Sequence, residues 1–92
     1  MEWIVKIDNK PKFRILVKYK PLDDLLVFYG QYKINNLDWI DFSVYEVNKN
    51  VDLDTIQSTM IKVYNQLEER VTVYENLSEG FSYIKRIEVM KD

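Results

Sequence analysis

Residues 12–20 read KFRILVKYK, and this stretch decides the fold. Its odd positions are aromatic or aliphatic, whereas its even positions are basic except for Leu16. Because successive side chains of a strand point to opposite faces, a period of two predicts a half-buried β-strand. One face of this strand is apolar and the other is basic.

Three more stretches of strand-forming residues surround this one, at 3–8, 24–33 and 38–47. Turn-forming residues separate the four stretches: Asn9-Lys10-Pro11, Pro21-Leu22-Asp23 and Asn35-Asn36. Short connections between strands predict consecutive antiparallel hairpins, and therefore a β-meander. Gly30, inside the third stretch, predicts a bulge or bend.

The period of the apolar residues changes after residue 50. In 51–77 they recur at steps of three and four, at positions 53, 56, 60, 63, 64, 67, 71, 74 and 77. This stripe is typical of an amphipathic helix. Asp52 or Asp54 would suit its N-cap, and Gly80 is placed where a glycine could end it.

The alternating segment Val71-Thr72-Val73-Tyr74 leaves a second interpretation open. The helix could end near Arg70 and be followed by a hairpin of 71–76 with 81–89. We favour the long helix, because no helix breaker separates Glu69 from Val71 and the stripe continues to Leu77. Residues 81–89, FSYIKRIEV, are then predicted to form a C-terminal strand.

The sequence therefore predicts one α+β domain over residues 1–92, with the order β-β-β-β-α-β. An antiparallel β-meander of four strands is followed by one long amphipathic helix packed on one sheet face, and by a C-terminal strand. The helix must cover the sheet, because neither could otherwise bury its apolar side. We expect the strands to lie in the order four, three, two, one, five.

The sheet face that the helix leaves open is where we expect function. A turn that pairs Tyr19 with Asp24 would direct four residues toward the helix, Ile15, Val17, Leu26 and Phe28. It would direct Leu16, Leu25, Val27 and Tyr29 away from the helix. The same alternation on the fourth strand directs Ile40, Phe42 and Val44 inward, and Trp39, Asp41, Ser43, Tyr45 and Val47 outward. Six outward residues are the candidate partner contacts: Leu16, Leu25, Val27, Tyr29, Trp39 and Tyr45.

Strands that are apolar on both sides usually have both faces covered. Three explanations stay open for this sheet. A protein partner or a second copy covers the outer face, the sheet curls enough to shelter it, or the register differs by one residue and exchanges the faces.

The basic residues suggest an alternative, which is binding of single-stranded nucleic acid. Residues 1–20 hold six basic residues against two acidic ones. Cations can follow phosphates while aromatic rings stack on bases. The candidate contacts are Lys6, Lys12, Arg14, Lys18 and Lys20. Two observations argue against nucleic-acid binding. The net charge is -2, and Lys on the surface of a strand commonly serves to prevent aggregation.

The composition excludes several common kinds of catalytic site and leaves only an enzyme that would use Asp, Glu, Lys or Tyr. The chain has no His and no Cys, which excludes the Ser-His pair, thiolate chemistry and Cys/His zinc sites. Its two glycines form no phosphate-binding loop. Acidic pairs such as Asp52 and Asp54 have structural explanations at turns and caps. We predict no catalytic residue, no cofactor and no metal.

No apolar run approaches the roughly 18 residues of a membrane span, and the N-terminal MEWIVKIDNKPK lacks the pattern of a secretory signal. We therefore expect a cytoplasmic protein without membrane contact. Alanine is absent and Gly, Pro and Arg are scarce, as in an AT-rich genome of a bacterium or phage. The expected function is non-enzymatic: binding of a protein partner, or of itself as a homodimer, through the helix-free face or an edge strand.

Overall fold

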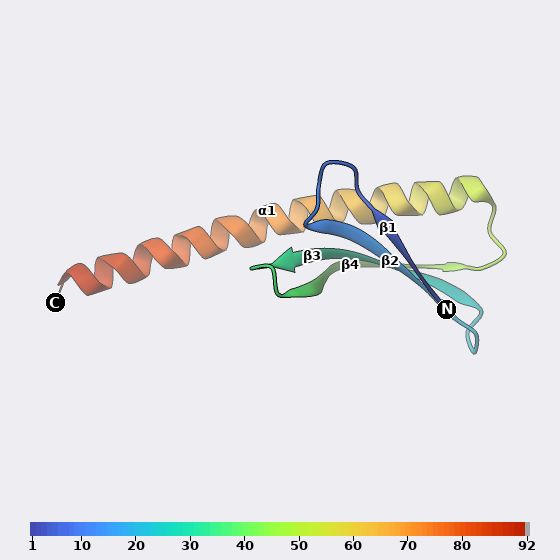
Figure 1. The fold of residues 1–92 in the computed structure, drawn as a ribbon, viewed down its shortest axis with the longest axis horizontal. Helices are drawn as coiled ribbons and strands as arrows, with labels where there is room; N and C mark the ends of the chain where they lie inside the picture. Colours follow the sequence, from blue (N-terminus) through green and yellow to red (C-terminus); the bar gives the residue numbers. More distant parts are fainter. Residues whose placement is uncertain (92) are drawn as a thin grey trace.

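The structure is a computed structural model that describes the backbone of residues 1–91 and the side chains of residues 1–77. Four strands precede one helix (Figure 1): β1 (Glu2–Lys6), β2 (Phe13–Lys20), β3 (Leu25–Ile34), β4 (Asp38–Asn48) and α1 (Leu53–Lys91). The strands form one antiparallel sheet in the order β1-β2-β3-β4. The predicted α+β class, a meander followed by a helix, is confirmed.

The segment 71–76 belongs to α1, as the long-helix interpretation predicts. The predicted helix end near Gly80 and the predicted strand over 81–89 fall beyond Leu77, where side chains lie outside the described residues and the backbone is drawn as part of α1. The C-terminal strand is therefore not assessed and stays a prediction.

The predicted turns form where residues tolerate a left-handed backbone. Asn35 and Asn36 have φ of 51° and 57°, and the N–H of Leu37 donates to the carbonyl of Ile34 at 2.9 Å. Two consecutive positive φ values at the central positions make a type I′ turn, which matches the twist of a hairpin.

The β2–β3 turn is longer than predicted. Asp24, with φ of 54°, belongs to the turn, and Tyr19 pairs with Leu26 rather than with Asp24. A shift of two residues keeps every side chain on its face. Ile15 and Phe28 therefore face α1, as predicted, although they pair with Gly30 and Val17.

A bulge in β4 changes which side chains face the helix. Gly30 pairs with Ser43 and Gln31 pairs with Asp41, so Phe42 is an extra residue opposite β3. Gly30 thus marks the irregularity, as predicted, but the extra residue lies on the neighbouring strand. Because side chains alternate along a strand, one extra residue exchanges the faces beyond it.

The predicted orientation of β4 is therefore correct before the bulge and wrong after it. Phe42 packs against the cluster formed by Tyr32, Leu67 and Val71, on the helix side. Val44, predicted to point inward, lies on the helix-free face. Three residues predicted to point outward face α1 instead: Ser43, Tyr45 and Val47.

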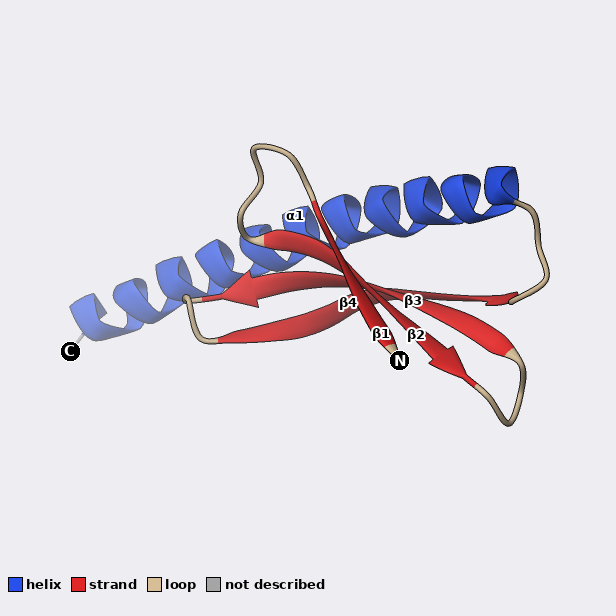
Figure 2. Cartoon of the chain, turned by 45° about the vertical axis from the view of Figure 1, so that its right-hand side comes forward, coloured by secondary structure: helices blue, strands red, loops and turns tan. Residues whose placement is uncertain are grey.

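Helix α1 begins at an N-cap and covers one face of a twisted sheet (Figure 2). The carboxylate of Asp52 accepts hydrogen bonds from the N–H and the hydroxyl of Thr55, at 2.9 and 2.6 Å, which satisfies a free donor of the first turn. The buried stripe contains Ile56, Met60, Val63, Tyr64, Leu67 and Val71. The helix packs mainly against β3 and β4 and makes fewer contacts with β2.

The helix approaches the sheet most closely at Gly30. A Cβ atom built there would overlap the Ser43 hydroxyl oxygen and would lie 3.0 Å from Val63 Cγ1 and 3.1 Å from Leu67 Cβ. The Ser43 hydroxyl fills the remaining space and donates to the carbonyl of Val63 at 2.9 Å. Absence of a side chain at residue 30 lets α1 pack against the backbone of β3.

We predict that Gly30→Ala destabilises the protein by about 3 kcal/mol, the upper part of the range for overpacked cores, because α1 must move outward. Urea unfolding measures this free energy. In a double-mutant cycle, Ser43→Ala should offset part of the loss by removing the overlapping oxygen. Equal stability of Gly30→Ala and the wild type would contradict the close contact.

Candidate interaction surface

An apolar row crosses the helix-free face from one edge of the sheet to the other. Ile4 pairs with Leu16, Leu16 with Tyr29, and Tyr29 with Val44, so one side chain from each strand takes part. We call Ile4, Leu16, Tyr29 and Val44 the apolar row. Cross-strand neighbours on one face are close enough to form a continuous contact surface.

The two ends of the apolar row are open and its centre is sheltered. Ile4 is 55% exposed and Val44 is 48% exposed, whereas Leu16 is only 8% exposed. Tyr29 is half-buried. The exposed apolar area of this face therefore lies near both edge strands rather than over the middle of the sheet.

Charged rows flank the apolar row on both sides. One contains Glu2, Lys18, Val27 and Glu46; the other contains Lys6, Arg14, Gln31 and Asp41. Val27 is 1% exposed between Lys18 and Glu46, because long charged side chains cover apolar neighbours with their stems. Lys18 also lies 3.5 Å from the carboxylate of Glu2 and over the ring of Tyr29.

Arg14 is held by a polar chain that crosses three strands. Its Nε donates to Gln31 Oε1 at 2.7 Å, and Gln31 Nε2 donates to Asp41 Oδ1 at 2.7 Å. The guanidinium lies 4.2 Å from the ring centre of Trp39. Burial lowers the pKa of Arg14, and the carboxylates of Asp41 and Glu2 oppose this change. Arg14 is therefore built into the face.

Five of the six predicted partner contacts lie on the helix-free face. Leu16 and Val27 are buried there, and Leu25, Tyr29 and Trp39 are half-buried. The predicted outward orientation of Tyr45 is wrong, because the β4 bulge places it opposite Phe28 on the side of the sheet that α1 covers. The exchange of faces predicted for a register error therefore occurs only in β4 beyond the bulge, and Leu16 and Val27 are buried on the helix-free face without a partner.

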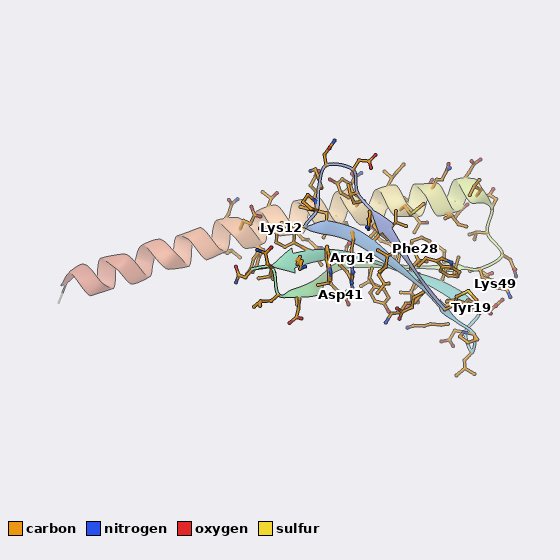
Figure 3. The ribbon with its side chains drawn as sticks, in the orientation of Figure 1. Lys12, Arg14, Tyr19, Phe28, Asp41 and Lys49 are labelled. Atoms are coloured by element: carbon orange, nitrogen blue, oxygen red, sulfur yellow. The ribbon has the colours of Figure 1, made fainter. Side chains whose placement is uncertain are left out.

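The basic candidates for nucleic-acid contact divide into two groups. Lys6, Arg14, Lys18 and Lys20 lie on the helix-free face, by their pairing in β1 and β2. Lys12 lies just before β2, at the opposite end from Tyr19 (Figure 3).

Ile4 and Val44 are the exposed positions that sequence reasoning missed. The alternation of residues 3–7 could have identified Ile4, since Trp3, Val5 and Ile7 occupy the other face. No comparable signal identifies Val44, because its orientation depends on the bulge.

Two polar clusters join segments of the fold. Lys10 Nζ and the hydroxyl of Tyr64 each lie 2.7 Å from Glu68 Oε2, which ties the β1–β2 loop to α1. These bonds lower the pKa of Glu68 and raise the pKa of Lys10. Lys49 lies 3.3 Å from Asp24 at the other end of the sheet. Both clusters have a structural explanation.

A shallow hollow at the β3–β4 turn is lined by Ile34, Leu37, Asp38 and Ile40 and has a volume of about 160 Å³. Ligand pockets usually measure roughly 300–1,000 Å³. The described residues contain no group of three acidic side chains that could hold a metal ion. Within residues 1–91, no helix is long and apolar enough to cross a bilayer.

Comparison with protein-family models, curated proteins and solved structures finds no match to the chain. The geometry of the sheet is therefore the basis for assigning a function.

We predict that Asp41→Ala destabilises the protein by about 1 kcal/mol, because the amide of Gln31, which is buried, loses its acceptor. Asp38→Ala, a substitution of an exposed residue on the same strand, is the control and should have little effect. Thermal unfolding of both variants makes the comparison. A larger loss in Asp38→Ala would contradict the assigned role of the polar chain.

Proposed function

We propose that the protein is a small non-enzymatic interaction module of the cytoplasm. It binds a protein partner or a second copy of itself through the helix-free face or an edge strand. The observation that carries this proposal is the apolar row, whose ends at Ile4 and Val44 stay exposed while α1 covers only the opposite face. Exposed apolar patches rimmed by charge mark protein-binding surfaces.

The charged rows support a protein partner rather than a lipid or a small molecule. They carry both signs, with Glu2, Glu46 and Asp41 among the basic residues. Mixed charges around an apolar centre set the register and choice of a protein partner.

We predict that Val44→Asp weakens association through this face by about tenfold or more, the loss expected when a buried Val is replaced by a charge. Val73→Asp is the matched control, since Val73 is 54% exposed on α1. Sedimentation equilibrium over a concentration series measures self-association of both variants and the wild type. Equal association of all three would place the contact away from this end of the face.

Single-stranded nucleic acid is the second candidate, favoured by the four basic side chains on one face with Tyr29 and Trp39. The acidic residues on that face weaken the proposal, and Arg14 already lies over the Trp39 ring. Nucleic-acid binding predicts a complex with an oligonucleotide at low salt that weakens as salt rises.

For this candidate, Lys18→Glu should weaken oligonucleotide binding, and Lys62→Glu on α1 should not, although both change the net charge equally. Fluorescence anisotropy with a labelled single strand measures both. Absence of binding by the wild type at low salt rejects the candidate.

A further inference from the structure

β1 is an edge strand whose outward backbone groups have no partner in the described part of the chain. In an antiparallel ladder, the backbone N–H and C=O groups of every second residue of an edge strand bond to the neighbouring strand. The backbone groups of the residues between them point away from that strand. The N–H of Tyr19 donates to the carbonyl of Met1 at 3.2 Å, so the odd-numbered residues of β1 bond to β2. The N–H and C=O groups of Glu2, Ile4 and Lys6 therefore point outward.

The other edge of the sheet is protected near its bulge, whereas β1 has no bulge. The bulge interrupts β4, and Arg70 of α1 donates to the carbonyl of Phe42 there at 2.6 Å. Bulges of this kind prevent an edge from pairing with another strand. Among the described residues, α1 makes no close backbone approach to β1.

The sequence of β1 is complementary to itself. When two copies pair antiparallel about Ile4, Ile4 meets Ile4, and Glu2 of each copy meets Lys6 of the other. All three side chains lie on the helix-free face. Opposite charges at directly paired positions stabilise a sheet and like charges destabilise it.

This register uses all the outward backbone groups of β1. A pairing centred on Trp3 leaves Lys6 without an opposite residue in the strand, and one centred on Val5 does the same to Glu2. Both also place a charge against Ile4. The register about Ile4 therefore has the best charge match and the most hydrogen bonds.

We propose that the protein forms a symmetric dimer in which β1 pairs with β1 of a second copy and joins the two sheets into one. The two apolar rows then meet through Ile4 and become one continuous row across both copies. This inference rests on the proposed function for the role of that row, whereas the pairing itself rests on the edge of β1.

Ile4→Pro tests the backbone pairing. Proline removes an N–H that points outward and takes no part in the β1–β2 ladder, a position where edge strands accept proline. Sedimentation equilibrium should show dimerisation weakened by about tenfold or more. Ile4→Val keeps the N–H and should dimerise like the wild type.

Charge reversal tests the register and does not depend on the proline variant folding. Glu2→Lys and Lys6→Glu each place like charges opposite each other in both pairs, so each alone should dimerise about tenfold more weakly at low salt. Mixing the two variants places opposite charges in both pairs, and the mixed dimer should recover wild-type affinity. Mixed variants that fail to recover overturn the register.

A single cysteine tests the position of the axis, since the chain has no cysteine of its own. Paired residues of this type lie about 5.5 Å apart between Cα atoms, within the range of a disulfide. Under mild oxidation Ile4→Cys should give a covalent dimer in high yield, and Val44→Cys should give little. Equal yields overturn the proposal.

Other occupants of the β1 edge give different results. A strictly monomeric protein overturns the proposal and leaves the edge to another protein's strand or to residues 81–89. A dimer lost in Val44→Asp and kept in Ile4→Pro belongs to the face and overturns β1 pairing. A dimer lost in Ile4→Pro and kept in Val44→Asp supports β1 pairing, even if the helix-free face does not bind a partner as proposed.

Discussion

The packing of α1 against the backbone at Gly30 determines which parts of the sheet stay open. Because residue 30 has no side chain, Val63 and Leu67 reach the middle of β3, and the helix lies over β3 and β4. A single helix is too narrow to cover a four-stranded sheet, since its diameter with side chains is about 10–12 Å and strands are about 4.8 Å apart. Its position over one half leaves β1 at an open edge and the other face uncovered.

On the helix-free face, the sequence limits how much apolar surface is exposed to water. Val27 and Leu16 lie at its centre, where exposure would be least favourable, and charged side chains on both sides cover them. Arg14 is fixed by Gln31 and by the ring of Trp39, so its position does not depend on a partner. The apolar area that stays exposed lies at Ile4 and Val44, where no further strand follows to supply a covering side chain.

The sequence predicts those features that depend on local pattern. The alternation of residues 12–20, the stripe of α1 and the asparagines at 35 and 36 each specify their own element. The predicted orientation of the side chains in β2 and β3 is correct although the predicted turn is too short, because a shift of two residues leaves each side chain on the same face. The bulge in β4 has no such local signal, because no residue of β4 itself indicates that Phe42 and Ser43 both face the helix. Ser43 faces the helix because it packs beside Gly30 of the neighbouring strand. The errors at Val44 and Tyr45 follow from this one non-local cause.

The difference between the two edges follows from the same packing. α1 lies close enough to β4 for Arg70 to bond to the carbonyl of Phe42 in the bulge, so this edge is distorted and occupied at that point. The backbone of α1 does not approach β1, and β1 pairs with β2 in a regular ladder. The outward N–H and C=O groups of β1 are therefore evenly spaced. Edge strands in a monomer are usually blocked by an inward-pointing charge, a proline or a bulge. β1 has no proline, bulge or inward-pointing charge. It is short and carries two charges, which can also protect an edge, but these charges are placed where an antiparallel copy of the same strand would neutralise them.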